Sequence, residues 1–354
     1  MARAKVKASG KGRKYRFSFG PWNIHEGADP FGPPVRQPIA FAKKLKKYRE
    51  LGFEGIQFHD DDAVPDIDSK SPQQVRKEAA RLGKLLANEG LVPEFVAPRL
   101  WESPKTIDGG FTSNNPAERK YAFQRSLQAV DIAAELGSKN IVLWLAREGT
   151  YIRESKNARL ANGYILDAIN AMLEHNPEIR VMIEPKPNEP MDHAYVPTIG
   201  HAISLAYLSV DPNRVGGLIE TAHAKLAGLD PSDEMAFALF HKKLWSVHLN
   251  DQNGLKFDED KSFGAANLRE AFNQVRVLEE GGFGLNGEFV GLDVKVMRTQ
   301  KANNATAHLS NSKRFFELMV HKVRTFNRKA EAECIKNRDY EALERLVVEH
   351  LLGV

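Results

Sequence analysis

Short apolar segments alternate with longer segments of helical periodicity along most of the chain. Eight of the short segments have the length and apolar content of buried strands, and they lie at residues 17–22, 55–59, 92–97, 140–144, 180–184, 217–221, 245–250 and 288–293. Helix-start signals stand between them, because Ser71 and Asn115 each precede a proline, as helix-capping residues often do. This alternation predicts repeated strand–helix units.

Eight such units without an evident linker favour one α/β domain, the (β/α)8 or TIM barrel, over an open sheet. A barrel of this kind takes about 250 residues. The 354 residues of the chain therefore leave a segment at each end. We predict a basic, disordered arm at residues 1–16, the barrel at residues 17–325, and a charged, amphipathic helical tail at residues 326–354.

The basic excess of the chain is concentrated near its N-terminus. The formal net charge is +4, from 50 Lys and Arg against 46 Asp and Glu. Seven of the basic residues and none of the acidic ones fall within residues 1–16, which leaves a net charge of −3 on the remainder. A net charge of −3 on the remainder argues against a nucleic-acid partner, because nucleic-acid binding needs a basic groove on the protein.

Cysteine content and hydropathy restrict the expected location. The single cysteine, Cys334, cannot form a disulfide within the chain, which is typical of a reducing compartment. No run of about 18 apolar residues predicts a membrane span. The first residues also lack the apolar core of a secretory signal. We therefore expect a cytoplasmic protein without a membrane partner.

Acidic and imidazole side chains follow five of the predicted strands. The carboxyl ends of TIM-barrel strands meet at one rim, which carries the active site. The residues expected there are His59, Asp62, Glu184, Lys186, Glu220, His223, His248, Asn250 and Asp293, with Asp258 and Asp260 in a loop. A single residue of this kind is usually part of a turn or of the core, so it is weak evidence for a site. Several carboxylates packed together are stronger evidence, because they repel one another unless cations lie among them. Oxygen ligands with one or two imidazoles favour Mg, Mn or Co, so the set predicts a metal site.

These motifs resemble those of xylose isomerase, of the shorter-chain class. The most specific are His59-Asp-Asp-Asp62 and Glu184-Pro-Lys-Pro-Asn-Glu-Pro190, and further matches follow in order along nearly the whole chain. The resemblance implies an aldose–ketose isomerase acting on D-xylose, and also on D-glucose, by ring opening and a metal-assisted 1,2-hydride shift. It also implies a homo-oligomer, a tetramer or a dimer, in which the C-terminal helical tail packs on a neighbouring subunit.

The resemblance assigns two divalent metal ions, Mg, Mn or Co, to each subunit. The implied ligands of the first ion are Glu184, Glu220, His248 and Asp293, and those of the second ion are Glu220, His223, Asp258 and Asp260. His59, oriented by Asp62, would open the sugar ring, and Lys186 would bind the carbonyl oxygen of the open chain.

The resemblance also implies residues that would contact the sugar or enclose it. Trp22 and Trp144 would wall the pocket against water, and Phe31 would reach into the pocket of the neighbouring subunit. The predicted substrate-binding set is completed by Arg99, Trp101 and Asn250.

Four departures from the family pattern bear on metal, substrate and assembly. His248 stands where the family has an aspartate ligand. If the imidazole coordinates the metal ion, the site favours Mn, Co or Fe over Mg. If the imidazole turns away, a water fills the coordination position. Arg99 and Trp101 replace Asn and Phe, so they reshape the sugar pocket unless Arg99 faces outward. The loop before Phe31 is one residue shorter, and the shorter tail makes a dimer as strong a candidate as a tetramer.

Other functions therefore stay open at this point. A reshaped pocket suits a related isomerase or epimerase with another sugar, including an acidic sugar that pairs with Arg99. The altered ligand set also allows a protein that binds sugar and metal with little turnover, although His59, Asp62 and Lys186 argue against that reading. A metal-dependent nuclease would need a basic groove that the acidic remainder does not predict.

Overall fold

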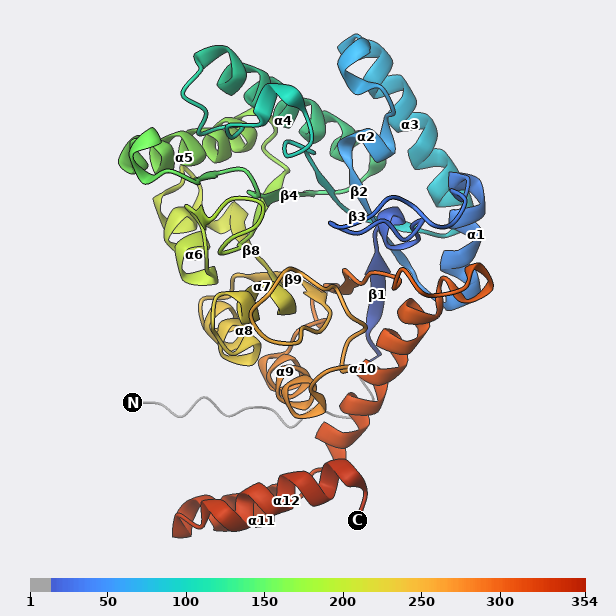
Figure 1. The fold of residues 1–354 in the computed structure, drawn as a ribbon, viewed down its shortest axis with the longest axis vertical. Helices are drawn as coiled ribbons and strands as arrows, with labels where there is room; N and C mark the ends of the chain where they lie inside the picture. The colour runs from blue at the N-terminus through green and yellow to red at the C-terminus, as the bar shows by residue number, and fades with distance from the viewer. Residues whose placement is uncertain (1–13) are drawn as a thin grey trace.

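Eight parallel strands close into a barrel in the order β1-β10-β9-β8-β6-β4-β3-β2 in the computed structural model, which describes residues 14–354 (Figure 1). The strands are β1 Arg16–Phe19, β2 Gly55–His59, β3 Val92–Ala97, β4 Asn140–Trp144, β6 Arg180–Glu184, β8 Val215–Glu220, β9 Leu244–Leu249 and β10 Phe289–Leu292. All eight predicted strands are present, and β2, β3, β4 and β6 have the predicted bounds. The prediction of a TIM barrel is confirmed.

Helices surround the barrel (Figure 1). They are α1 Phe41–Leu51, α2 Asp60–Ala63, α3 Pro72–Glu89, α4 Pro116–Leu136, α5 Ala158–His175, α6 Ile199–Leu208, α7 Thr221–Leu226, α8 Pro231–Phe240, α9 Leu268–Gly281 and α10 Ala307–Thr325. Single 3-10 turns lie at Pro21–Asn23, Ile67–Ser69, Pro104–Thr106, Arg153–Ser155, Pro212–Arg214 and Ala302–Asn304. The short helices α2 and α7 follow strands β2 and β8 directly, and they place side chains of the predicted motifs over the rim.

The predicted helix starts are formed by side-chain caps. Ser71 Oγ accepts the backbone N–H of Gln74 at 3.4 Å, and Gln74 Oε1 accepts the N–H of Ser71 at 2.8 Å. Asn115 Oδ1 accepts the N–H of Ala117 at 2.9 Å. These bonds satisfy backbone donors that have no partner within the helix.

A small antiparallel sheet was not predicted. It consists of β5 Gly149–Thr150 and β7 His193–Ala194. Two residues per strand are too few for a period-two pattern, so the sequence carries no signal for it. The sheet joins the loops that follow β4 and β6, next to the rim.

The inside of the barrel holds an apolar cluster and a polar cluster. The apolar cluster consists of Phe95, Ala97, Val142, Met182 and Leu218. The polar cluster consists of Ser18, Gln57, Glu94 and Ser246, which are buried and joined by hydrogen bonds. Because alternate residues of a strand share a face, Gln57 lies on the same side of β2 as His59 at the rim.

Strand β1 begins one residue earlier than predicted. Arg16 Nε lies 3.0 Å from Glu54 Oε2, and its guanidinium lies 4.1 Å from the centre of the Phe289 ring. Arg16 therefore belongs to the barrel and not to the predicted arm. Residues 1–13 of that arm lie outside the described residues.

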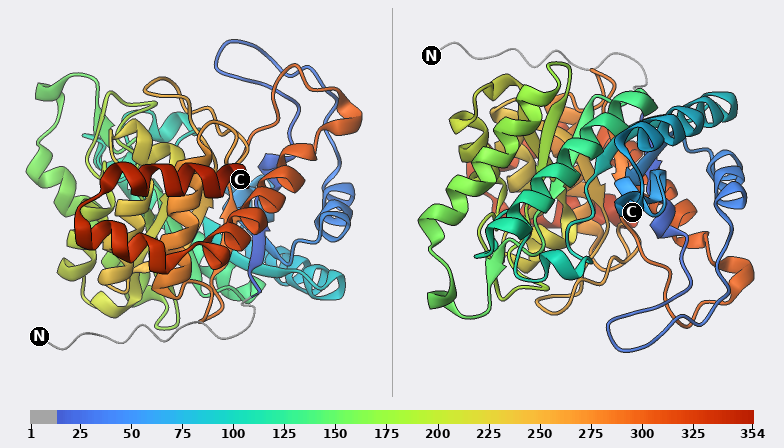
Figure 2. Two further views of the ribbon diagram at one scale, coloured as in Figure 1. Left: turned by 90° about the horizontal axis from the view of Figure 1, so that it is seen from below. Right: turned by 90° about the horizontal axis from the view of Figure 1, so that it is seen from above.

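The C-terminal tail forms a helical hairpin beyond α10, from α11 Arg328–Asn337 and α12 Tyr340–Leu352 (Figures 1 and 2). Arg276 Nη1 on α9 lies 2.5 Å from Glu331 Oε1, and Arg269 Nη2 lies 2.8 Å from Glu344 Oε2. These ion pairs attach the hairpin to the barrel of its own chain, and its packing on a neighbouring subunit stays a prediction. No helix among residues 14–354 is long and apolar enough to cross a membrane.

Candidate active site

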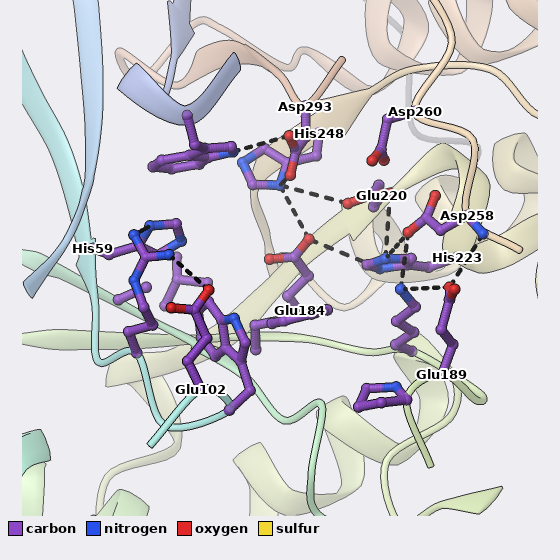
Figure 3. A pocket seen from close by; sticks show the side chains of 18 of the residues that line it. His59, Glu102, Glu184, Glu189, Glu220, His223, His248, Asp258, Asp260 and Asp293 are labelled. Atoms are coloured by element: carbon purple, nitrogen blue, oxygen red, sulfur yellow. Dashed lines mark hydrogen bonds and ion pairs between the residues drawn. The ribbon is translucent and has the colours of Figure 1, made fainter. Parts of the chain in front are cut away.

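A cavity of about 800 Å³ opens at the carboxyl ends of the strands. Most of the residues predicted from the sequence line it, namely Trp22, His59, Arg99, Trp101, Trp144, Glu184, Lys186, Glu220, His223, His248, Asp258, Asp260 and Asp293. His59 and Glu102 lie on one side of the cavity (Figure 3). The other side gathers the remaining imidazoles and most of the carboxylates, namely Glu184, Glu220, His223, His248, Asp258, Asp260 and Asp293. The fold therefore brings together side chains from every part of the barrel.

The first group of possible metal ligands consists of Glu184, Glu220 and His248, whose ligand atoms lie within 4.8 Å of one another. His248 Nδ1 lies 3.0 Å from Glu184 Oε1 and 3.8 Å from Glu220 Oε2. It also lies 4.0 Å from Asp293 Oδ2. One imidazole nitrogen thus faces three carboxylates, and strand pairing places them there because His248 lies opposite Glu220 in neighbouring strands.

The second group consists of Glu220, His223 and Asp258, again within 4.8 Å of one another. His223 Nε2 lies 3.1 Å from Asp258 Oδ2 and 3.3 Å from Glu220 Oε1. Asp260 is buried nearby and pairs with Lys295 Nζ at 2.7 Å. Glu220 belongs to both groups of possible ligands.

The electrostatics of this cluster fit cations. Burial and the charge of Asp258 raise the pKa of Glu220 well above its usual value, and the same two causes raise the pKa of Asp260. His223 Nδ1 and Asp258 Oδ1 are buried and have no hydrogen-bond partner among residues 14–354. Buried polar atoms without partners are rare in folded proteins, so the donor set is suited to divalent metal.

The carboxylates around His248 favour the protonated form of its imidazole. Burial opposes protonation, but the charge of Glu184 and its hydrogen bond raise the pKa of His248 to about 9. The same pairing overcomes burial and lowers the pKa of Glu184 to about 2. A metal ion that binds Nδ1 must displace this proton.

The opposite side of the cavity carries an imidazole–carboxylate pair. His59 Nδ1 lies 2.8 Å from Asp62 Oδ2. Arg99 also faces the cavity, and its Nη2 lies 2.7 Å from the same nitrogen. Arg99 is held by three carboxylates, because its guanidinium lies 2.8 Å from Asp61, 3.1 Å from Asp62 and 3.2 Å from Glu102.

Three tryptophans form the walls of the cavity. The Trp22 ring lies 4.1 Å from the His59 ring between centres, and Trp22 Nε1 donates to Asp293 Oδ1 at 3.0 Å. Trp101 meets Trp144 edge to face at 4.5 Å. Trp101, which is larger than the Phe of the family pattern, therefore lies inside the cavity and narrows the space beside His59.

Lys186 lies between the aromatic wall and the carboxylates. Its Nζ lies 2.9 Å from Asp258 Oδ2, 3.3 Å from Glu189 Oε2 and 5.2 Å from the centre of the Trp144 ring. Burial opposes its charge, but the two carboxylates raise the pKa of Lys186 above its usual value. The ammonium group therefore stays charged inside the cavity.

Two predicted substrate contacts lie elsewhere. Asn250 is fully buried behind the cluster, where its Nδ2 donates to Glu220 Oε1 at 2.8 Å and its Oδ1 accepts the N–H of Ala222. It therefore supports a carboxylate and does not line the cavity. Phe31 is 81% exposed outside this cavity and packs against Phe257, with 5.6 Å between ring centres. Its contact with a neighbouring subunit stays a prediction.

Four residues of the site were not among the catalytic, metal-binding and substrate-binding residues predicted from the sequence. Glu189 and Lys295 line the cavity and pair with Lys186 and Asp260. Gln57 and Glu94 lie below the rim inside the barrel. Two signals in the sequence could have indicated these residues. Lys295 follows Asp293 by two residues, and Gln57 and Glu94 are polar residues within two predicted strands that are otherwise largely apolar.

Comparison with known proteins places the chain in a family. A family model described as a xylose isomerase-like TIM barrel matches residues 45–284. The chain belongs to this xylose isomerase-like family. A xylose isomerase of Thermus thermophilus is 32% identical over 384 aligned residues, which cover 96% of this chain and 98% of the relative. The resemblance that the motifs indicated is thereby confirmed.

Solved structures share the fold of this family. L-ribulose 3-epimerase matches with a TM-score of 0.62 at 14% identity and covers 90% of this chain and 98% of its own. D-psicose 3-epimerase matches with a TM-score of 0.62 at 14% identity, over 86% and 99%. The IOLI protein, solved with a zinc atom, matches with a TM-score of 0.62 at 13% identity, over 87% and 99%.

Proposed function

We propose that this protein is a metal-dependent aldose–ketose isomerase, with D-xylose and D-xylulose as its default substrate pair. The observation that carries the proposal is Glu220, which belongs to two buried carboxylate–imidazole groups in one cavity with Lys186 and His59. The Thermus xylose isomerase supports the proposal as a relative along nearly the whole chain. A pocket with a binuclear ligand set, an ammonium group and an imidazole–carboxylate pair has the parts that sugar isomerisation needs.

The residues of the cluster fit two divalent cations. Glu184, Glu220, His248 and Asp293 would hold the first, and the proposed ligands of the second are Glu220, His223, Asp258 and Asp260. When bound, such ions supply Lewis acidity to the sugar oxygens and lower the pKa of water. The nitrogen of His248 in place of an oxygen favours Mn or Co over Mg.

His59 is the proposed acid–base group for opening the sugar ring. Its Nδ1 contacts Asp62 and Arg99, so Nε2 is the nitrogen left for the ring oxygen of a sugar. Burial opposes the charge of Asp62, but the bond from His59 and the charge of Arg99 lower the pKa of Asp62 below its usual value. Asp62 therefore stays ionised and can stabilise an imidazolium.

Lys186 and the tryptophans complete the proposed mechanism. The buried ammonium of Lys186 would donate to the carbonyl oxygen of the open chain, where negative charge develops. Trp22, Trp101 and Trp144 would exclude water from the reacting carbons. Asn250 and Lys295 would hold Glu220 and Asp260 in place through the bonds that they donate.

A sugar epimerase is the second candidate. Arg99 and Trp101 occupy space beside His59, so the pocket differs from the pattern on which the xylose assignment rests. Two structures with this fold are named L-ribulose 3-epimerase and D-psicose 3-epimerase. A pocket reshaped at these two positions would select another sugar while keeping the same ligand set.

The deciding experiment supplies metals and sugars separately. The protein is stripped of metal, restored with Mg, Mn or Co in turn, and incubated with panels of aldoses and ketoses. Formation of a ketose from D-xylose supports the proposed isomerase, whereas conversion of one ketose to its 3-epimer supports the second candidate. Sugar binding without conversion of any sugar under any metal would contradict both.

A further inference from the structure

The side chain of Gln57 connects His248 to a buried carboxylate inside the barrel. His248 Nε2 lies 3.2 Å from Gln57 Oε1. Gln57 Nε2 lies 3.1 Å from Ser18 Oγ and 3.2 Å from Glu94 Oε2. The exposed fractions are 2% for His248, 0% for Gln57 and 4% for Glu94, so water does not compete for these bonds.

Glu94 determines which way the amide of Gln57 points. Three donors converge on its carboxyl group, since Ser246 Oγ donates to Oε1 at 2.6 Å and both Ser18 Oγ and Gln57 Nε2 donate to Oε2. Burial raises the pKa of Glu94, whereas the hydrogen bonds from its three donors oppose that rise and stabilise the ionised carboxylate, which only accepts hydrogen bonds. The nitrogen of the Gln57 amide therefore faces Glu94, and the oxygen faces His248.

This orientation selects one tautomer of His248. An amide oxygen only accepts, so the hydrogen of a neutral His248 ring lies on Nε2 and the lone pair lies on Nδ1. Nδ1 is the nitrogen that faces Glu184 at 3.0 Å, Glu220 at 3.8 Å and Asp293 at 4.0 Å. The free lone pair thus points into the first ligand group.

We propose that Gln57 and Glu94 are positioning residues that present Nδ1 of His248 to the first metal ion. This inference rests on the proposed function in one respect, namely that the first ligand group holds a divalent cation. It adds a reason why His248 suits this barrel. An aspartate ligand has no tautomer to select, whereas an imidazole needs a partner that holds its second nitrogen.

The backbone around the chain of bonds supports this role. Ile56 pairs with Pro93 and Gln57 pairs with Phe95, so Glu94 is the extra residue of a bulge in β3. Bulges redirect side chains, and this one turns Glu94 toward the barrel interior. A Cβ atom at Gly291 would lie 2.7 Å from Gln57 Nε2, so the missing side chain leaves room for the amide.

The first test measures metal affinity without sugar. Gln57→Met removes the amide at similar volume, and calorimetric titration of the metal-stripped protein with Mn²⁺ should show the first site weakened by about 10- to 100-fold. Glu94→Gln should also lower the Mn²⁺ affinity of the first site, and this variant replaces Gln57→Met in the test if Gln57→Met does not fold. Met182→Leu is the matched control, because Met182 is equally buried inside the barrel. Unchanged affinity in both test variants would overturn the proposal.

A second test separates positioning from damage to the barrel. In a His248→Asp background, Gln57→Met should cause no comparable further loss of Mn²⁺ affinity, because a carboxylate has no tautomer to select. The two substitutions are then strongly non-additive. An equal loss in both backgrounds would show that Gln57 only supports packing, and it would overturn the proposal.

A third test observes the hydrogen on Nε2 directly. In the Co²⁺-loaded protein, the proton of His248 Nε2 should give a paramagnetically shifted NMR signal that exchanges slowly with solvent and is absent in His248→Asp. Gln57→Met should make this exchange fast. Absence of the signal in the unmodified protein would overturn the proposal. None of these readouts involves turnover, so a protein that isomerises no sugar would refute the proposed function and leave this inference intact.

Discussion

Arg99 Nη2 and Asp62 Oδ2 approach the same nitrogen of His59, at 2.7 Å and 2.8 Å. A guanidinium only donates and a carboxylate only accepts, so His59 Nδ1 cannot satisfy both at once. Arg99 also lies 3.1 Å from Asp62 Oδ1, which lets it retain an ion pair while Nδ1 bonds to the carboxylate. Arg99 therefore belongs to the imidazole–carboxylate pair and is not a free cation in the pocket.

This arrangement predicts a preference for neutral sugars. The carboxylates of Asp61, Asp62 and Glu102 already occupy Arg99, so the carboxylate of a uronic acid would meet an acidic rim. We expect kcat/KM for D-xylose to exceed that for a uronate by at least about tenfold, since like charges placed together cost several kcal/mol. The measurement compares the two sugars under the same metal.

A partner variant checks the cause of that preference. Glu102→Gln removes one carboxylate from Arg99 and should raise the relative rate on the uronate. A preference of the unmodified protein for the uronate would show that Arg99 leaves its carboxylate partners when substrate binds, and it would contradict the predicted preference for neutral sugars.

His59→Gln should reduce kcat on the cyclic sugar by about 10²- to 10⁴-fold, because general acid–base catalysis contributes that much. KM should change less, since the aromatic walls and the cluster remain. Asp62→Asn should give a smaller loss, because the side chain still contacts the ring without stabilising its charge. Steady-state kinetics and the thermal midpoint of unfolding are compared for each variant. A kcat that is unchanged in His59→Gln would remove His59 from the mechanism.

His248→Asp should shift metal preference toward Mg²⁺. The substitution replaces an imidazole nitrogen with oxygen, and Mg²⁺ prefers oxygen ligands. The ratio of dissociation constants for Mg²⁺ and Mn²⁺ at the first site measures the effect. His241→Asp is a suitable control, because His241 lies outside the cavity and contacts Tyr207 instead. An unchanged ratio would show that residue 248 does not coordinate.

The sequence predicted the barrel and most of the cavity because both depend on local patterns. Strands such as Asn140–Trp144 are nearly continuous apolar runs, and the rim collects whatever residue follows each strand. Glu184, Glu220 and His248 could therefore be expected to meet although they are far apart in the sequence. The resemblance to a family supplied their individual roles.

The contacts missed from the sequence depend on register and side-chain direction. Glu94 enters the barrel through a bulge, and a period-two pattern does not predict a bulge. Asn250 follows His248 by two residues, so the strand pattern predicts that it faces the cavity as His248 does. Its side chain instead donates to Glu220 and accepts the N–H of Ala222. Arg99 could have faced outward, but the carboxylates of Asp61, Asp62 and Glu102 hold its guanidinium inside the cavity of the folded chain.

Lys186→Met should lower kcat by about 10²- to 10³-fold, because it removes a donor at the developing negative charge. Lys186 Nζ also lies 2.9 Å from Asp258 Oδ2 and competes with cations for that carboxylate. Metal affinity at the second site should therefore stay equal or rise in the variant. Kinetics and Mn²⁺ titration together check the prediction. A joint loss of kcat and of metal affinity would assign Lys186 a structural role.

His308 makes unfolding depend on pH below neutrality. Its Nε2 bonds to the backbone oxygen of Asn23 at 2.8 Å, and burial, with help from the charge of Arg36, lowers the pKa of His308 to about 4. Between pH 6.5 and 4 the unfolded chain binds a proton at this residue that the folded chain does not bind. The stabilisation from His308 is therefore complete above pH 6.5 and is lost as the pH falls toward 4, by at most about 3 kcal/mol.

Urea unfolding of the metal-free protein and of the variant His308→Gln at pH 7.5 and pH 4.5 tests this pH dependence. The variant keeps an amide donor for Asn23 but has no group that titrates. The difference in unfolding free energy between the two proteins should favour the unmodified protein at pH 7.5 and shrink, or reverse, at pH 4.5. His321→Gln, on the exposed side of the same helix, controls for the loss of an imidazole. A difference between the unmodified protein and His308→Gln that is the same at both pH values would show that His308 takes up its proton equally in the folded and unfolded chain.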